Sequence, residues 1–232
     1  MKPSKILVKK AIWTALCLTM LLTVLSAQAT SPKQIVVFGE SNSDVGNLYI
    51  IFGSPTDYGW FTDGRIGNGP QWTDYLASYY KHVPEMRPSL EGGTSYATAG
   101  ADTTYGAGCN GLGSTGQQVT QYLGATPLVS GTGNKLFIFW GGVNDLIFCG
   151  ETDVAVPVGN IVDQIGMLFD AGARHFLVLT MPPIGYMPVG LAGTGSPNEE
   201  LNEMAEAFNE AMLAQLRDFK CDKRAAHIYV LD

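Results

Sequence analysis

The stretch IVVFGESNSDVGN, residues 35–47, sets the start of the fold. Its first four residues are apolar and mostly β-branched, which is typical of a strand buried in a parallel sheet, and Gly39 ends the run. Ser41 then stands in a cluster of small polar residues. Ligands of open α/β sheets bind beyond the carboxyl ends of the strands, so this serine is placed where it could meet one. A plain polar turn would give the same pattern, and these residues alone leave both interpretations open.

Three further motifs follow the first along the chain. The four are FGESNSDVGN at 38–47, G-R-x-x-N-G-P-x-W at 64–72, SYATAGADT at 95–103 and GVND at 142–145. Together they resemble the sequence blocks of the GDSL, or SGNH, family of serine esterases and lipases. The first block of that family reads F-G-D-S-L-S-D-x-G-N, so Glu40 replaces an aspartate and Asn42 a leucine. In the later blocks, Gly67 replaces a serine, Ser95 an asparagine and Ala99 a glycine.

The resemblance implies a site for cleaving esters. Such a site needs an oxygen nucleophile and fixed donors aimed at the carbonyl oxygen, where negative charge develops. By resemblance, Ser41 is the nucleophile, and the donors are its own backbone N–H, the N–H of Gly100 and the side-chain amide of Asn144. Each is expected just beyond a different strand, so the three could converge at one edge of a parallel sheet.

The family's general base is the part of the site that the sequence does not supply. In the family, a histidine and its aspartate come from a D-x-x-H block in the loop after the fifth strand, and no D-x-x-H occurs in these 232 residues. The histidines are His82, His175 and His227. The last two are expected to open strands at the amino edge of the sheet, and a five-residue strand is roughly 16 Å long, whereas proton transfer needs about 3 Å. We therefore expect none of the three to serve as base.

Two functions from different classes follow. In one, the chain is a hydrolase of carboxylic ester bonds that is truncated or incomplete, so that it is inactive without a further C-terminal segment. In the other, it is a secreted, non-catalytic remnant of such an enzyme that binds ligands in the cleft where the enzyme would bind its substrate. Reading the coding sequence beyond Asp232 for a D-x-x-H motif would separate the two.

Hydrophobic periodicity and turn residues predict an α/β fold of alternating strands and helices. Strands are expected at 35–38, 95–98, 135–140, 175–180 and 227–231, and helices at 71–80, 115–122, 158–170 and 198–219. The last helix has Asn198 as its cap and an apolar face. With the family resemblance, this predicts a three-layer αβα sandwich with a mainly parallel five-stranded sheet, the flavodoxin-like SGNH hydrolase fold, lacking its C-terminal loop and helix.

The first 29 residues have the three parts of a secretory signal peptide. Four lysines precede an apolar run at 11–25, and Ala27-Gln28-Ala29 follows. A membrane anchor is the alternative, but the run is short for a span that needs about 20 residues. We therefore expect cleavage near Ala29, a secreted or periplasmic protein, and one hydrolase-like domain at 30–232. Losing the lysines changes the formal charge from −7 to −11, which argues against a nucleic-acid partner. The family resemblance implies a small-molecule or lipid ester as substrate, which could lie at a membrane surface, and no obligate partner is evident.

Cysteine usage leaves one question open. Cys109, Cys149 and Cys221 follow the predicted leader, and the first two fall in loops after predicted strands, so a disulfide between them is as plausible as its absence. No spacing of cysteines or histidines predicts a metal site. No cofactor is expected either, because acyl transfer by a serine needs none.

Overall fold

A computed structural model describes residues 31–54, 59, 61–126, 134–192 and 195–232. The expected signal peptide, 1–29, lies outside these residues. No helix among them combines the length and apolar character that crossing a membrane requires.

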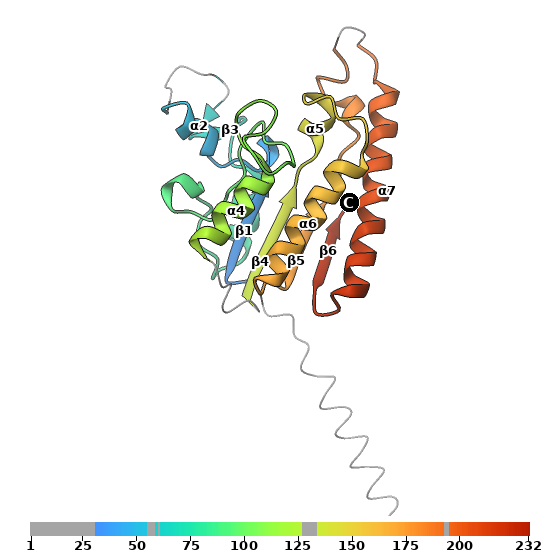
Figure 1. The fold of residues 1–232 in the computed structure, drawn as a ribbon. Helices are drawn as coiled ribbons and strands as arrows, with labels where there is room; N and C mark the ends of the chain where they lie inside the picture. Colours follow the sequence, from blue (N-terminus) through green and yellow to red (C-terminus); the bar gives the residue numbers. More distant parts are fainter. Residues whose placement is uncertain (1–30, 55–58, 60, 127–133, 193–194) are drawn as a thin grey trace, which may run out of the picture. The chain divides into compact units, whose positions relative to one another are not determined.

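The main sheet has four parallel strands in the order β1-β4-β5-β6. They are β1 (Gln34–Gly39), β4 (Lys135–Trp140), β5 (His175–Leu179) and β6 (His227–Leu231). All four lie where the sequence predicted strands, because each is a short apolar run bounded by turn residues. Their common direction puts every carboxyl end at one edge of the sheet (Figure 1).

The expected fifth strand at 95–98 is corrected by the structure. This segment does lie beside β1: the Val37 N–H donates to the Thr94 carbonyl (3.0 Å), and the Tyr96 N–H donates to the Val37 carbonyl (2.7 Å). It forms only an isolated bridge, however. Ser95 bonds through its backbone to Arg87 and Ser89 on its other side, which turns the chain out of a regular ladder. The sheet of the described residues is therefore four-stranded with an irregular edge.

Helices cover both faces of the sheet, which makes three layers. One face carries α4 (Thr115–Ala125), α6 (Ala155–Asp170) and α7 (Glu199–Asp222), and the other carries α3 (Trp72–Tyr79). Figure 1 shows α4 and α6 in front of the strands. All four helices lie where the sequence predicted them, within three residues at each end.

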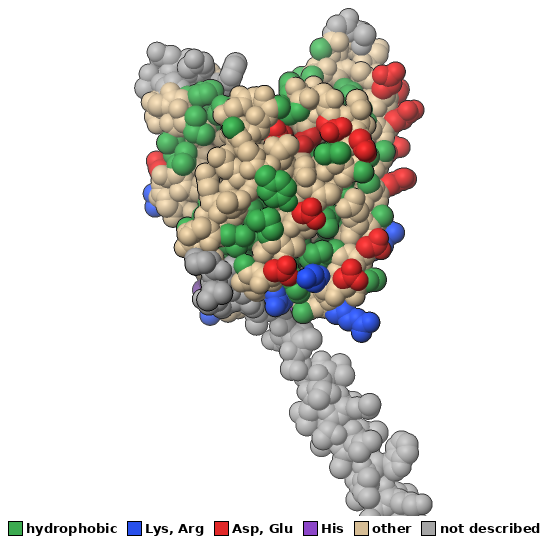
Figure 2. All heavy atoms as spheres, viewed as in Figure 1, with side chains coloured by type: hydrophobic (Ala, Val, Ile, Leu, Met, Phe, Trp, Pro, Cys, Tyr) green, Lys and Arg blue, Asp and Glu red, His purple; other side chains and the backbone are tan. Residues whose placement is uncertain are grey.

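The helix α7 shows how the sequence pattern becomes packing. The Asn198 side chain accepts from the Leu201 N–H (3.2 Å), which caps the first turn as predicted. The buried side of the helix packs into the core through Ala205, Phe208, Met212 and Leu216. The opposite side is acidic, and Figure 2 shows red carboxylates along this edge. They include Glu199, Glu200, Glu203, Glu206 and Glu210, all exposed.

Short elements that the sequence did not predict surround the carboxyl edge. They are η1 (Ser41–Ser43), α2 (Asn47–Ile51), the hairpin of β2 (Phe61–Thr62) and β3 (Arg65–Ile66), η2 (Ser89–Glu91), α5 (Val143–Ile147) and η4 (Ile184–Tyr186). Each is too short to show a hydrophobic period. Three of these elements nevertheless hold motif residues at the site: Ser41 lies in η1, Asn47 in α2 and Asn144 in α5.

The edge strand β6 is uncovered on one face, whereas the neighbouring β5 is buried or half-buried along its whole length. Phe176 and Val178 point into the core under α6 and α7 and are 0% and 1% exposed. Tyr229 and Leu231 of β6 are 47% and 53% exposed. Because a parallel sheet normally has both faces covered, this surface is available for association.

We expect the 232-residue chain to self-associate at micromolar concentration, because this uncovered apolar face adjoins the unpaired edge of β6. Size-exclusion chromatography with light scattering measures the effect. The double variant Tyr229→Ser/Leu231→Ser should shift the population toward monomer. Tyr79→Ser, at an exposed tyrosine on α3, is the matched control and should leave the distribution unchanged. A monodisperse wild-type monomer would contradict the expectation.

Candidate active site

Ser41 lies directly beyond the carboxyl end of β1. The strand ends at Gly39, Glu40 is extended, and Ser41 opens η1 in a half-buried position. Among the described residues, no hydrogen bond holds its hydroxyl or its backbone N–H. The serine therefore has its nucleophilic atom and one potential oxyanion donor unoccupied.

The end of β1 is held by a residue that the sequence analysis missed. The Gln118 side chain, buried on α4, accepts from the Gly39 N–H (2.9 Å) and donates to the Gly39 carbonyl (2.8 Å). A side chain at position 39 would collide with the Trp140 carbonyl oxygen on β4. Gln118 thus bonds both backbone groups of Gly39, whose carbonyl also accepts from the Thr98 N–H (3.1 Å). The only signal in the sequence was a glutamine among the apolar positions of a helix.

Gly100 lies in the turn that ends the segment beside β1. Its φ of +83° is in the left-handed region, and a Cβ there would approach the Asn110 amide nitrogen to 2.8 Å, so glycine is required on both grounds. Its carbonyl accepts from Asn110 (2.6 Å). No described residue accepts from its backbone N–H, so this second donor is also unoccupied.

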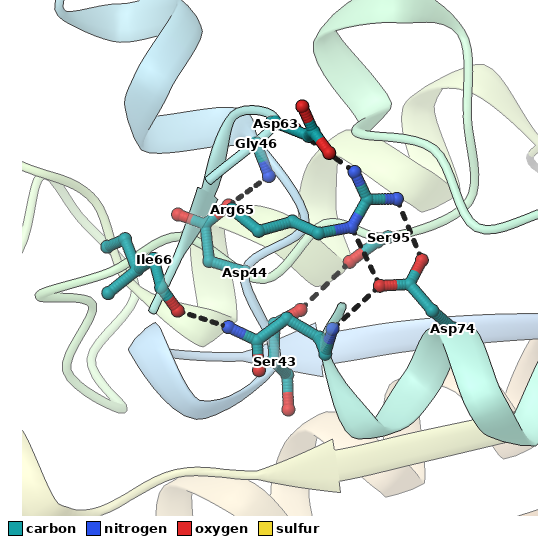
Figure 3. Close-up of polar contacts among 9 residues, drawn as sticks. Ser43, Asp44, Gly46, Asp63, Arg65, Ile66, Asp74 and Ser95 are labelled. Atoms are coloured by element: carbon teal, nitrogen blue, oxygen red, sulfur yellow. Dashed lines mark hydrogen bonds and ion pairs between the residues drawn. The ribbon is translucent and has the colours of Figure 1, made fainter. Parts of the chain in front are cut away.

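A buried carboxylate joins the Ser41 and Gly100 segments. Asp44 accepts from the backbone N–H groups of Gly46 (2.8 Å), Asn47 (2.7 Å), Leu48 (3.1 Å) and Ala99 (2.8 Å). Figure 3 shows the first of these bonds. The position after Ala99 is Gly100, so the same carboxylate orients both the turn after Ser41 and the turn that carries the second donor.

The substitutions in the third motif are accommodated. Ser95 is buried, and its hydroxyl donates to the Ser43 carbonyl (3.3 Å), as Figure 3 shows. Asn47 donates through its side-chain amide to the carbonyls of Ser95 (2.8 Å) and Ala97 (2.9 Å). The first and third motifs therefore remain bonded to each other despite Ser95 and Ala99.

Asn144 is the second residue of α5, just beyond β4. Its amide nitrogen donates to the Glu40 carboxyl (Oε2, 2.7 Å) and to the Ala101 carbonyl (2.7 Å). The fourth motif thus touches both the residue before Ser41 and the residue after Gly100. The structure brings together all three segments that carry Ser41, Gly100 and Asn144.

Besides Asp44, two further buried carboxyl groups, Glu40 and Asp145, lie at this junction. Glu40 is 2% exposed, and burial raises its pKa from an ordinary 4.5 to about 8, with a further contribution from the nearby charge of Asp145. Hydrogen bonds from Asn144 and Asn42 oppose the rise without cancelling it. Burial also raises the pKa of Asp145 to about 6, against hydrogen bonds from Thr103. Glu40 is consequently mostly protonated at pH 7.

The second motif, residues 64–72, contacts the first motif through α3. The Arg65 guanidinium forms a two-point ion pair with Asp74 (Nε–Oδ2 2.7 Å, Nη2–Oδ1 2.8 Å), drawn in Figure 3. The same carboxylate accepts from the Gln71 N–H (2.8 Å) and so caps α3. Trp72 on α3 then donates to the Ser43 hydroxyl (3.2 Å). The motif therefore connects the hairpin and α3 to η1 and contacts no proposed reacting atom.

The histidines lie away from this junction or on the surface. His175 and His227 are the first residues of β5 and β6, and their rings stack with centroids 4.6 Å apart. Since the strands are parallel, this pair sits at the amino edge, as predicted, and Ser41 sits beyond the carboxyl edge. His82 follows α3 and is exposed.

The structure answers the question of the disulfide. Cys109 and Cys149 are bonded, with Cα atoms 5.7 Å apart, which ties the loop after Gly100 to the chain after α5. Cys221 is free and exposed. Together with Asp102, the two bonded sulfurs are the one group of potential metal ligands clustered in the described part of the chain. Because both sulfurs are consumed by the disulfide, only the Asp102 carboxylate is left as a metal ligand.

A pH-dependent loss of stability is expected from Glu40. A carboxyl whose pKa is raised in the folded state stabilises the fold fully below its unfolded pKa, and this contribution is lost as pH rises toward the folded pKa. Between pH 4.5 and about 8 the free energy of unfolding should therefore fall, and Glu40→Gln should be more stable than wild type at pH 8 by up to about 4 kcal/mol.

Urea unfolding from pH 4 to 8 measures the difference between the two proteins. Asp145 contributes its own decline below pH about 6 in both, so the window from pH 6 to 8 isolates Glu40. Glu85→Gln, at an exposed carboxyl with no bonded partner among the described residues, is the control and should follow the wild-type curve. Parallel curves for wild type and Glu40→Gln would mean that Glu40 is charged at neutral pH.

Comparison with known proteins finds relatives of this chain. A protein in Vibrio parahaemolyticus named thermolabile hemolysin is 28% identical over 199 residues, covering 83% of this chain and 44% of its own. An acetylesterase of Thermothelomyces thermophilus is 26% identical over 211 residues, covering 82% and 67%. The chain thus spans less than half of the hemolysin's length.

A solved structure shares the fold of this chain, and a family model matches its sequence. A carbohydrate acetylesterase from Sinorhizobium meliloti has a similar fold, with a TM-score of 0.54 and 13% identity, covering 85% of this chain and 83% of its own. The model of the GDSL-like lipase/acylhydrolase family matches residues 35–232, from the first strand to the last residue. The chain therefore belongs to the GDSL-like lipase/acylhydrolase family.

Proposed function

We propose that this chain is the hydrolytic domain of a carboxylic ester hydrolase that uses Ser41 as its nucleophile. The observation that carries the proposal is the meeting of three segments at one sheet edge, where the Ser41 hydroxyl and the backbone N–H groups of Ser41 and Gly100 have no partner among the described residues. A nucleophile next to unoccupied donors is what acyl transfer requires.

The proposed reaction is an acyl transfer in two steps. The Ser41 oxygen attacks the ester carbonyl carbon while its proton passes to a base, and the carbonyl oxygen becomes an oxyanion bound by the unoccupied N–H groups of Ser41 and Gly100. The C–O bond to the alcohol then breaks, the alcohol takes the proton, and an acyl-serine is left. Water hydrolyses this ester by the reverse proton route and releases the carboxylic acid.

Among the residues that the structure describes, no histidine is brought to Ser41 as a base. The sequence holds no D-x-x-H, and the two strand histidines occupy the opposite sheet edge. We infer that this chain hydrolyses esters slowly through Ser41. A catalytic histidine and its aspartate would have to be supplied from outside these residues.

A nearby cavity supports an uncharged substrate. It measures about 220 Å³, and its lining includes Thr98 and Gln118, which flank the Gly100 turn and the end of β1. No charged side chain lines it, and the exposed Ile51 and Leu90 stand at its rim. Most of the other lining side chains are uncharged amides and hydroxyls, among them Gln117 and Gln121. We propose a neutral ester, and a lipid ester at a membrane surface is one candidate. Rates across p-nitrophenyl esters of increasing acyl length would rank the candidates.

We expect free imidazole to substitute for the missing base. With p-nitrophenyl acetate and no added base, wild type and Ser41→Ala should hydrolyse at the same near-background rate. With imidazole, wild type should exceed Ser41→Ala by at least about tenfold after the protein-free rate is subtracted. Ser78→Ala, at an exposed serine of α3, is the control and should match wild type.

Two outcomes would overturn this proposal. Equal rates of wild type and Ser41→Ala in imidazole would remove Ser41 as nucleophile. Fast hydrolysis by wild type alone, abolished by Ser41→Ala, would show that the chain already holds its base.

We further propose that the protein is exported and loses residues 1–29. Four lysines before an apolar run, with Ala27-Gln28-Ala29 after it, support this location. Mass spectrometry of the secreted or periplasmic product should give the mass of a chain whose first residue is Thr30. An intact N-terminus on an exported or membrane-bound product would contradict cleavage.

A further inference from the structure

The three proposed oxyanion donors differ in one respect. Among the described residues, the N–H groups of Ser41 and Gly100 donate to nothing, whereas the amide of Asn144 is fully used. A primary amide has two hydrogens, and here one goes to Glu40 Oε2 and the other to the Ala101 carbonyl, both at 2.7 Å. Asn144 therefore has no hydrogen left for a substrate oxygen.

The backbone around Asn144 leaves little room for rearrangement. The next residue, Asp145, accepts from both the N–H (3.1 Å) and the hydroxyl (2.6 Å) of Thr103. The side chains of Asn144, Asp145 and Thr103 are all buried. The Ala101 carbonyl belongs to a main-chain turn closed by the Ala101 N–H on Thr98 (3.1 Å). Of the two acceptors, the Glu40 carboxyl is the one on a side chain that can move.

Glu40 also has the length that this contact needs. Its Oε2 reaches the Asn144 side-chain nitrogen at 2.7 Å and the Asn144 backbone N–H at 3.4 Å, while Oε1 accepts from Asn42 (3.2 Å). Removing one methylene would withdraw the carboxyl by about 1.5 Å, which takes the amide contact beyond hydrogen-bonding distance.

We propose that Glu40 is a positioning residue that holds the Asn144 amide in a closed arrangement and so limits its use as an oxyanion donor. The inference rests on the proposed function. Glu40 touches no reacting atom; it acts through Asn144. Shortening it to aspartate frees one amide hydrogen at the Ser41 edge of the sheet, and glutamine keeps an acceptor at full length.

The contact itself is tested without any turnover. In ¹⁵N-labelled protein, the side-chain amide signal of Asn144 is assigned by its loss in Asn144→Ala, and its hydrogen exchange is measured. In wild type and Glu40→Gln both hydrogens should be protected. In Glu40→Asp one of them should exchange at least about tenfold faster, because its bond is lost.

The backbone amide of Thr103, which donates to Asp145, is the internal control and should be unchanged in every variant. Unprotected Asn144 hydrogens in wild type, or equal exchange in wild type and Glu40→Asp, would overturn the proposal. Faster exchange of Thr103 as well would also overturn it, because the change would then be a general loosening of the fold.

The consequence for chemistry is tested with the imidazole-assisted, Ser41-dependent rate. Glu40→Asp should raise this rate several-fold, Glu40→Gln should not, and Asn144→Ala should cancel the gain in the double variant. A Glu40→Asp rate at or below wild type would overturn the positioning role. If no variant shows a Ser41-dependent rate, the proposed function fails, and the exchange measurement still decides whether Glu40 holds Asn144.

Discussion

The buried carboxylate of Asp44 is the interaction on which the geometry of the site depends. It accepts four backbone N–H groups, three from the start of α2 and one from Ala99. Hydrogen bonds to a charged group contribute roughly 1.5–3 kcal/mol each, so this one side chain opposes much of the cost of ordering two irregular turns. Burial raises the pKa of Asp44, and the four N–H donors act against that rise.

The parallel sheet decides which residues can cooperate. Every strand delivers the chain to the same edge, so Ser41 after β1 and Asn144 after β4 become neighbours although 103 positions separate them. The same rule separates Ser41 from His175 and His227, which begin their strands. The position of a residue relative to its strand, more than its chemical type, therefore decides whether it can join the site.

The sequence predicted what depends on long periodic runs. Strands β1, β4, β5 and β6 and helix α7 follow from apolar patterning, and the residues brought to the carboxyl edge follow from the motifs. The edge segment at 95–98 was predicted as a strand because its composition suits one, but the pairing of Ser95 with Arg87 and Ser89 is a long-range choice that no local pattern records. Gln118 escaped prediction for the same reason, because its partner Gly39 is 79 residues away.

Glu40, which replaces an aspartate of the family motif, is a buried carboxyl group with few backbone donors. Asp44 and Asp145 receive backbone donors, whereas the nearest donors to Glu40 are the side chains of Asn42 and Asn144 and one long backbone contact. Burial raises the pKa of Glu40 to about 8 and that of Asp145 to about 6, so Glu40 is mostly neutral at pH 7. A charged carboxylate beside Ser41 would repel an oxyanion formed at the same edge. Burial of Glu40 thus removes a negative charge from the place where the proposed reaction would create one, and its remaining influence there is the hydrogen bond to Asn144.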